Sequence, residues 1–309
     1  MPPSPRTSVA VLIPCLDEEK GIAAVVAEFR RELPKSRILV VDNGSSDATA
    51  KRAREAGAEV VSEPRRGKGR AIVTGFALLE EDVVIMVDGD GSYPAEGARR
   101  LLEAYGRDPA DMIAGVRSPE AAGAAFRRFH RVGSSAFALV FRLVFAHEPR
   151  DLFSGLRLLS RCFYKNVPLL FRGFELETEL TVQAVEKGFR VSEVEIPFRE
   201  RAAGSVSKLR TVHDGLRILR LLVVLFRDYR PLLFFGSISF LFFGAGLAAG
   251  ALPIFEYFTT RMVGRFPLAI LAAGLMNLSL FTLLTGVMLE SSLRHRREAY
   301  QVTLRNYRK

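Results

Sequence analysis

The sequence contains no tryptophan and, among its 309 residues, only two cysteines and four histidines. Cys15 and Cys162 are too few for a disulfide framework, and no metal-ligand spacing surrounds them. We expect both to be buried free thiols in a reducing compartment. No GxGxxG follows the first predicted strand, and no GxxxxGK[ST] is present. These absences exclude the dinucleotide-binding and P-loop fingerprints.

The net charge of +10 comes entirely from the last third of the chain. Residues 1–198 hold 28 Lys/Arg and 28 Asp/Glu, whereas residues 199–309 hold 16 basic and 6 acidic residues. A soluble nucleic-acid-binding protein would carry its basic patch on a polar fold. Here the basic excess flanks the two longest uncharged apolar runs, which predicts a membrane protein with a neutral globular front end and no nucleic-acid partner.

The two apolar runs, 232–252 and 266–289, contain 21 and 24 residues. At about 1.5 Å per residue, each can cross a hydrocarbon core of about 30 Å. The segment between them, 253–265, is predicted to be a loop. Basic residues are dense outside the pair and sparse in this loop, so both ends are expected in the cytosol and the loop outside the cell membrane. The N-terminal residues lack the pattern of a secretory signal, which agrees with this orientation.

Ahead of the first run, residues 207–230 carry apolar side chains at spacings of three and four, which predicts an amphipathic helix. Such a helix can lie in the bilayer interface with its cations among anionic head groups. The alternative is an ordinary helix packed on the globular domain. The expected organisation is a globular domain at 1–205, a juxtamembrane helix at 206–230, two transmembrane helices at 231–290 and a basic cytosolic tail at 291–309.

The front end alternates short β-branched runs with helical patterns. Strands are predicted at 9–14, 37–42, 58–63, 83–88 and 111–116. Helices are predicted at 18–33, 46–56 (capped by Ser45 or Ser46), 69–79 and 94–105. Strands buried on both faces, with helices between them, indicate an α/β fold with a doubly wound, mostly parallel sheet. Ligands bind such sheets beyond the carboxyl ends of the strands.

Carboxylates follow three of these strands, at Glu18, Asp42 and Asp88-Gly89-Asp90, and Lys68 lies in a basic glycine-rich turn between them. Two carboxylates on a tight turn can face one hard cation, because magnesium and manganese prefer oxygen ligands and often share them with substrate phosphates. A purely structural acidic turn is the alternative for an isolated Asp-x-Asp. Its place after a buried strand, in register with the other carboxylates, favours a metal site.

Several segments together resemble the family 2 glycosyltransferases of the GT-A fold. They are PCLDEE (14–19), VVDNGSSDAT (40–49), RGKGRA (66–71), the DGD at 88–90, DLFSGLR (151–157), GFELETEL (173–180) and the stretch from Arg201 to Leu209. With two C-terminal spans added, the pattern is similar to the polyprenyl-phosphate glycosyltransferases of the dolichol-phosphate mannose synthase group. The resemblance implies a nucleotide-diphosphate sugar donor, a polyprenyl phosphate acceptor and a divalent metal, Mg²⁺ or Mn²⁺.

The resemblance also implies roles for individual residues. Those expected to line the nucleoside pocket are Pro14, Leu16, Glu18 and Asp42, with Asp42 bonding the base. Asp88 and Asp90 would serve the ribose and the metal, with Asp90 as the direct ligand, and Lys68 would lie near the nucleotide. The cations expected around the diphosphate and the acceptor phosphate are Arg117, Arg131, Arg201 and Lys208; the alternative for each is a solvated surface charge. The same motifs contribute Ser154, Gly155 and Ser207 as substrate-binding residues.

The sequence departs from the family pattern at four positions. Leu16 replaces an aromatic residue, Asn43 replaces a frequent second aspartate, Ser92 stands where a glutamine often helps to hold the metal, and Leu156 replaces an aromatic residue. None of these changes removes a charge that the chemistry needs.

The implied reaction is inversion at the anomeric carbon, with an oxygen of the lipid phosphate attacking and the nucleoside diphosphate leaving. A phosphate is already ionised at neutral pH, so no strong general base is needed. If the acceptor is instead a hydroxyl of a glycolipid or an envelope glycan, a carboxylate base is required. The candidates for that base are Asp151, Glu175, Glu177 and Glu179.

Other classes of protein fit less well. A processive polysaccharide synthase of this family would carry a QxxRW-type element, and the chain has no tryptophan. A transporter is disfavoured because neither span contains a charge. A membrane adaptor without catalytic activity would not need the DGD, Arg201 and Lys208. The sequence leaves the sugar, the base and the choice between a monomer and a homo-oligomer open.

Overall fold

The computed structural model describes residues 7–117, 141–142, 149–169, 176–199, 220 and 223–308. The chain divides into two compact units, residues 1–215 and residues 216–307. The first is an α/β unit, and the second contains the long apolar helices. The predicted sites at Arg131, Glu175, Arg201, Ser207 and Lys208, and most of the predicted amphipathic helix, lie outside the described residues.

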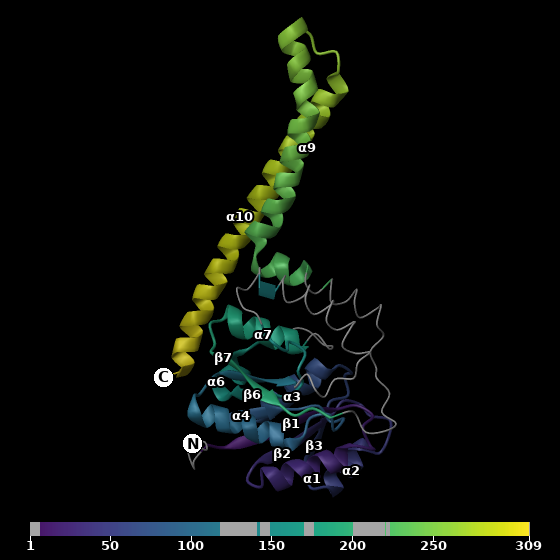
Figure 1. The fold of residues 1–309 in the computed structure, drawn as a ribbon, viewed down its shortest axis with the longest axis vertical. Coiled ribbons are helices and arrows are strands. Elements are labelled where there is room, and N and C mark those ends of the chain that lie inside the picture. Colours follow the sequence, from purple (N-terminus) through teal and green to yellow (C-terminus); the bar gives the residue numbers. More distant parts are fainter. Residues whose placement is uncertain are drawn as a thin grey trace. The chain divides into compact units, whose positions relative to one another are not determined.

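A seven-stranded sheet forms the centre of the first unit, in the order β3-β2-β1-β4-β6-β5-β7 (Figure 1). Its strands are β1 (Val9–Cys15), β2 (Arg37–Asp42), β3 (Glu59–Ser62), β4 (Val83–Met86), β5 (Met112–Arg117), β6 (Arg157–Ser160) and β7 (Val191–Ile196). β1 is parallel to its neighbours β2 and β4, β2 is parallel to β3, and β5 is parallel to β7. β6 is antiparallel to both of its neighbours, β4 and β5. The five predicted strands are confirmed, and β6 and β7 are additions to them.

Helices cover both faces of the sheet. The described ones are α1 (Ile22–Glu32), α2 (Thr49–Glu55), α3 (Lys68–Leu78), α4 (Ala95–Arg107), α6 (Arg161–Asn166) and α7 (Leu176–Glu186). Alternation along β1 explains the two layers: Val11 and Ile13 join the core cluster with residues of α1 and α4, whereas Leu12 faces Gly75 of α3. All three side chains are fully buried. Burial of each contributes about 1.5–3 kcal/mol, so the sheet is held from both sides.

Three predictions about the first unit were wrong. The second helix begins after Ala48 with no side-chain cap, because Ser45 and Ser46 bond to Asp17 instead. The first helix begins at Ile22 rather than Glu18, since residues 16–21 form a turn in which Asp17 has a φ of 52°. That turn brings the residues after β1 to those after β2. Both cysteines are free, but only Cys15 is buried; Cys162 is half-buried, which corrects the expectation for it.

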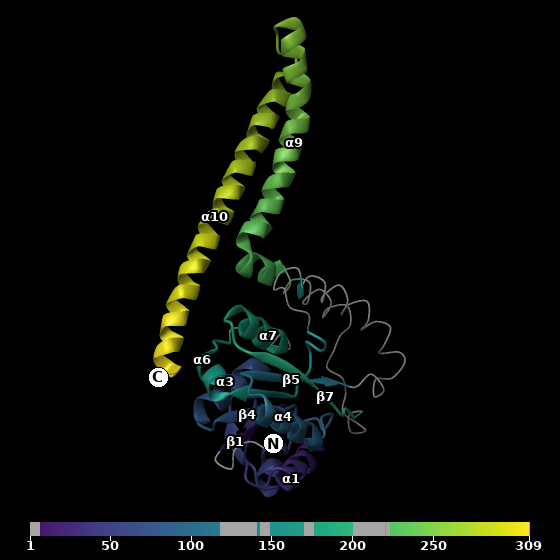
Figure 2. The same ribbon diagram turned by 60° about the vertical axis from the view of Figure 1, so that its left-hand side comes forward.

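The second unit contains α9 (Pro231–Thr260) and α10 (Phe266–Arg308), which run side by side (Figures 1 and 2). Both are long and apolar enough to cross a membrane. Most of the predicted loop is helical, because α9 continues to Thr260 and ends where Arg261 adopts a φ of 60°. Ser239 bonds across to the Ser279 carbonyl at 2.8 Å, and Gly246 allows close approach to Leu275 and Met276. Small residues and a buried hydroxyl thus join the two helices in the manner usual for membrane helix pairs.

The close packing of α3 on β1 gives a test of the fold. A Cβ on Gly75 would lie 2.3 Å from Cδ1 of Leu12. Gly75→Ala is therefore expected to destabilise the protein by about 1–3 kcal/mol, although the same change in an unhindered helix stabilises by about 1 kcal/mol. The measurement is thermal unfolding of the detergent-solubilised full chain by circular dichroism.

The matched control uses Leu12→Ala as the background. With the isobutyl group gone, Gly75→Ala should become neutral or stabilising. An equal loss of stability in both backgrounds would show that the contact with Leu12 is not what excludes a side chain at position 75.

Candidate active site

The residues that follow β1, β2 and β3 meet at one edge of the sheet, because these strands are parallel and in register. Cys15 is opposite Asp42, and the Asn43 amide donates to the Cys15 carbonyl at 2.8 Å. The Glu63 amide donates in turn to the Asp42 carbonyl at 2.8 Å. Pro14 and Asp42 are buried here, and Leu16 and Glu18 are half-buried. The four residues predicted to line a nucleoside pocket are therefore neighbours at this edge.

Asn43 fixes the basic turn that follows β3. Its buried side-chain amide donates to the carbonyls of Glu63 (3.0 Å) and Arg65 (2.8 Å), and its oxygen accepts from the Gly67 amide at 2.6 Å. An aspartate could accept from Gly67 but could not donate to two carbonyls. The amide at this position therefore has a structural reason, which the sequence alone did not show.

The carboxylate of Glu63 stabilises the same turn through hydrogen bonds. It accepts from Nε and Nη2 of Arg65, each at 2.8 Å, and from the Thr74 hydroxyl at 2.7 Å. These bonds hold the pKa of Glu63 well below its usual range. The turn thus reaches Lys68, the first residue of α3, with its geometry fixed at both ends.

The acidic turn Asp88-Gly89-Asp90 packs directly on β1. A Cβ on Gly89 would lie 2.5 Å from Sγ of Cys15, so only glycine fits there. Asp90 is 7% exposed, and its Oδ1 accepts from the amide (3.0 Å) and the hydroxyl (2.5 Å) of Ser92. Ser92 therefore orients the carboxylate that was predicted to bind metal.

Lys68 joins this turn to α7. Its Nζ lies 2.5 Å from Oδ1 of Asp88 and 2.5 Å from Oε1 of Glu177. Burial alone would lower the pKa of the Lys68 ammonium, but the two carboxylates outweigh it, and the pKa lies above its usual range. We call this set of three side chains the lysine bridge. It keeps a positive charge fixed where a nucleoside diphosphate is expected.

The second oxygen of Asp88 faces the predicted substrate residues of the segment before β6. A Cβ on Gly155 would lie 2.3 Å from Asp88 Oδ2, and the Gly155 amide donates to the Tyr93 hydroxyl at 2.8 Å. Burial raises the pKa of Tyr93 to about 12, so the phenol stays neutral. Ser154 is fully buried, and its hydroxyl has no hydrogen-bond partner. The close approach of Gly155 explains why glycine is required there.

Arg117 and Asp151 form a bidentate pair, with Nε to Oδ2 at 2.7 Å and Nη2 to Oδ1 at 2.8 Å. The Arg117 guanidinium also lies over the ring of Phe198, 5.4 Å from its centre. Burial opposes the charge of Arg117, but the carboxylate outweighs it and holds the pKa of this guanidinium above its usual range. Asp151 is thus engaged in holding Arg117, which does not suit the role of a general base.

Arg157 is the last residue of the DLFSGLR motif and lies at the centre of this segment. It is fully buried, and its guanidinium donates to the carbonyls of Leu152 (2.7 Å) and Ser154 (3.1 Å) and to the Thr181 hydroxyl (2.8 Å). Burial lowers its pKa from the usual value. Arg157 therefore ties the turn before β6 to α7. The available signal was a single arginine in the otherwise uncharged stretch from Leu152 to Ser160.

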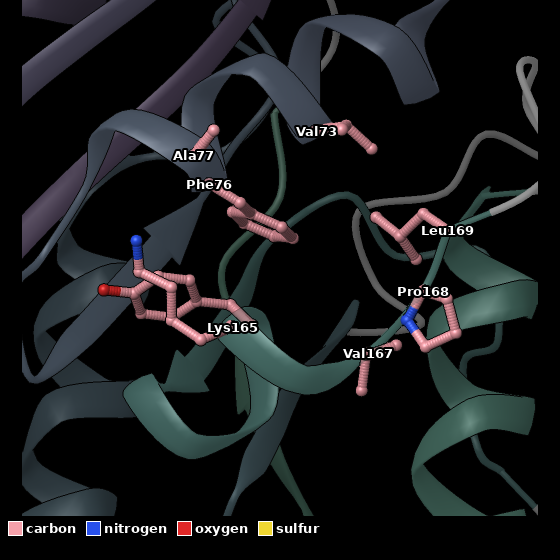
Figure 3. Close-up of a pocket in the computed structure, with 8 residues that line it drawn as sticks. Val73, Phe76, Ala77, Lys165, Val167, Pro168 and Leu169 are labelled. Atoms are coloured by element: carbon pink, nitrogen blue, oxygen red, sulfur yellow. The ribbon is translucent and has the colours of Figure 1, made fainter. Parts of the chain in front are cut away.

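The chain that leaves β7 is anchored at the acidic turn, since the Arg199 amide donates to the Ser92 carbonyl at 2.9 Å. A separate groove of about 350 Å³ lies between α3 and α6, lined by Val73, Phe76, Val167 and neighbours (Figure 3). It contains none of the predicted site residues. The site is therefore assigned from the strand ends and not from this groove.

The donor set at the acidic turn suits a divalent metal that shares its ligands with phosphates. Asp88 and Asp90 offer hard carboxylate oxygens, and Ser92 orients one of them, as partners of metal ligands commonly do. Among the described residues, no group of three acidic, histidine or cysteine side chains could hold a metal by itself. Substrate oxygens would therefore have to complete the coordination.

Comparisons with known proteins agree with this arrangement. The family model described as Glycosyl transferase family 2 matches residues 10–162. An uncharacterized glycosyltransferase of Mycobacterium tuberculosis is 34% identical over 198 residues, 64% of this chain and 88% of that protein. The chain belongs to the family 2 glycosyltransferases.

Two relatives from Haloferax volcanii extend the comparison. Glycosyltransferase AglJ is 29% identical over 94% of this chain and 95% of its own length. A protein named dolichyl-phosphate hexose transferase is 29% identical over 63% of this chain and 84% of its own length. The AglJ match thus includes the region of the apolar helices.

Among solved structures, glucosyl-3-phosphoglycerate synthase from M. tuberculosis, in complex with Mn²⁺, uridine-diphosphate and glucosyl-3-phosphoglycerate, superposes with a TM-score of 0.60. It is 19% identical and covers 72% of this chain and 80% of that chain. The likeness shows the fold, and it confirms the predicted GT-A class.

The role of Asn43 gives a test of the site. Asn43→Asp removes two donors from buried carbonyls and places a negative charge beside them, so a loss of about 2–3 kcal/mol in the free energy of unfolding is expected. The measurement is thermal unfolding of the full chain in detergent.

Asn166→Asp is the matched control. That amide is half-buried and donates to the Cys162 carbonyl at 2.8 Å, near the end of α6. The same chemical change should lower the free energy of unfolding by clearly less at this position. If the two variants are equally destabilised, Asn43 does not have the special supporting role assigned to it.

Proposed function

We propose that this glycosyltransferase moves a sugar from a nucleotide-diphosphate sugar to a polyprenyl phosphate, at the cytosolic face of the cell membrane. The observation that carries the proposal is the attachment of a family 2 domain to two helices, α9 and α10, that can cross a membrane. An acceptor with a long apolar tail stays in the bilayer, so its enzyme must work at that surface. The relative named dolichyl-phosphate hexose transferase supports the same acceptor class.

The donor is assigned to the edge of the sheet where β1, β2 and β4 end. The nucleoside would lie against Pro14, Leu16, Glu18 and Asp42. Asp88 would bond the ribose, and Lys68 would bind the diphosphate; the ammonium is held at this edge by Asp88 and Glu177, which supports that role. Fixed cations near a leaving diphosphate stabilise the charge that develops on it.

Asp90 would be the direct ligand of a divalent metal, Mg²⁺ or Mn²⁺, with Asp88 beside it. When bound, the ion would neutralise charge on the departing diphosphate. Ser92 keeps the Asp90 carboxylate in one orientation through two hydrogen bonds. Arg117 would add a further cation, held in place by Asp151.

The acceptor phosphate would be held by Arg131, Arg201, Ser207 and Lys208. Its oxygen would attack the anomeric carbon as the bond to the diphosphate breaks, with inversion. Asp151 and Glu177, two of the four candidate bases, are paired with Arg117 and Lys68. A nucleophile that is already ionised needs no base, so this pairing favours a phosphate over a hydroxyl acceptor.

The proposed function predicts that the labelled sugar of the donor is transferred to the lipid. Membranes containing the protein, with Mg²⁺, polyprenyl phosphate and a panel of labelled nucleotide sugars, should yield label that extracts into organic solvent. Asp90→Asn removes the carboxylate charge at the metal ligand and should lower this transfer at least about 100-fold. Scintillation counting of the organic phase is the measurement.

Asp108→Asn is the matched control, because Asp108 is 62% exposed and pairs with Arg190 at a surface. It should keep normal activity. Full activity in Asp90→Asn would refute the metal assignment, and absence of lipid label across a broad panel would contradict the proposed acceptor.

The pairing of Asp151 with Arg117 gives a separate test of the mechanism. Asp151→Asn keeps the shape but weakens the hold on Arg117, so KM for the donor should rise about tenfold, as for a lost charge-assisted pair. The pH dependence of kcat should stay as in the unchanged protein. A kcat that falls by orders of magnitude and loses its acidic limb would show instead that Asp151 is a general base.

A further inference from the structure

The lysine bridge has a consequence for the order in which the donor and the metal bind. Lys68 contacts Asp88 and Glu177 at 2.5 Å each, and its side chain is only 18% exposed. Asp88 is the carboxylate that stands next to the proposed metal ligand Asp90. The ammonium therefore occupies a carboxylate of the acidic turn.

Oδ1 of Asp88 is bonded to the ammonium, and Oδ2 lies so close to Gly155 that a Cβ there would be 2.3 Å from it. A divalent cation that approaches Asp88 meets a fixed positive charge within a few ångströms, in a partly desolvated place. Such like-charge repulsion is strong where solvent does not screen it.

A nucleoside diphosphate would weaken the hold of Lys68 on Asp88, because it offers the ammonium another anionic partner. When Lys68 turns toward phosphate oxygens, Glu177 and Asp88 lose their shared cation, and Asp88 becomes open to another one. Asn43 and Glu63 fix the turn before Lys68, so the movement is confined to the flexible lysine side chain.

We propose that Lys68 excludes divalent metal from Asp88 until the diphosphate of the donor draws its ammonium away. The inference rests on the proposed function, since it assumes that a metal and a nucleotide-diphosphate sugar share this edge. It assigns Lys68 a positioning role that couples the binding of the two. Metal alone would bind weakly.

The test is Mn²⁺ binding to the detergent-solubilised full chain without any nucleotide, followed by the electron paramagnetic resonance signal of free Mn²⁺. Lys68→Met should bind Mn²⁺ at least about tenfold more tightly than the unchanged protein. Addition of Asp88→Asn to Lys68→Met should abolish the gain, because the gain depends on that carboxylate.

A charge-matched variant distinguishes the release of Asp88 from Lys68 from a general change in the charge of the site. Lys68→Met combined with Glu177→Gln keeps the net charge of the bridge at about −1, as in the unchanged protein, and leaves no unpaired second carboxylate to disturb folding. It should still bind Mn²⁺ more tightly than the unchanged protein. Circular dichroism of each variant checks that it is folded.

Equal Mn²⁺ affinity in the unchanged protein and in the charge-matched variant would overturn the inference while leaving the metal site intact. Failure of every folded variant to bind Mn²⁺ without nucleotide would also overturn the inference. Failure to bind it even with a nucleoside diphosphate present would overturn the proposed metal assignment as well. A gain in Lys68→Met that survives Asp88→Asn would also overturn the inference, because the metal would then be bound elsewhere.

Discussion

The ion pairs of Lys68 with Asp88 and Glu177 join three segments that are far apart in the sequence. Lys68 begins α3, Asp88 follows β4, and Glu177 lies in the first turn of α7. Removing one member of such a partly buried set costs about 3–5 kcal/mol, because a charge is left without its partner. The rest of the site is arranged around this cluster: the turn before α3 is fixed by Asn43, and the segment before β6 approaches Asp88 at Gly155.

The fold places these groups together because parallel strands end at the same edge. β1, β2 and β4 are parallel neighbours, so the residues that follow them converge. β6 enters between β4 and β5 in the opposite direction, which brings the segment before it to the same edge. Arg157 at the start of β6 holds that segment through its carbonyls. Catalytic groups on such turns are well positioned, since the strands beneath them are buried.

The sequence was sufficient for the five parallel strands and for the two apolar helices. Four of these strands are runs of mostly buried apolar residues, and β3 carries the β-branched pair Val60-Val61. The sequence was not sufficient for β6 and β7. β6 is four residues long and begins with an arginine, and β7 carries two glutamates among half-exposed positions. Neither gives the continuous apolar run of a central strand. The helix cap at Ser45 or Ser46 failed because Asp17, a residue from another loop, competes for both serines.

The acidic turn, Lys68 and the serine-glycine segment were found as motifs, but their mutual contacts were not. The partners of Asn43 are backbone carbonyls about twenty residues away, and Glu177 is 109 residues from Lys68. Such contacts depend on where loops meet, which local spacing does not encode. The pairing of Asp151 with Arg117 was likewise not foreseen from the sequence.

We propose that the acceptor is a phosphate and not a hydroxyl. The bond that joins the transferred sugar to the lipid distinguishes the two. Labelled lipid made by the membranes would be extracted and treated with mild acid, and the released label would be identified by chromatography. A sugar joined to a polyprenyl phosphate should be released as the free sugar. Label that stays in the lipid after this treatment would show a glycosidic bond to a hydroxyl and would contradict the account.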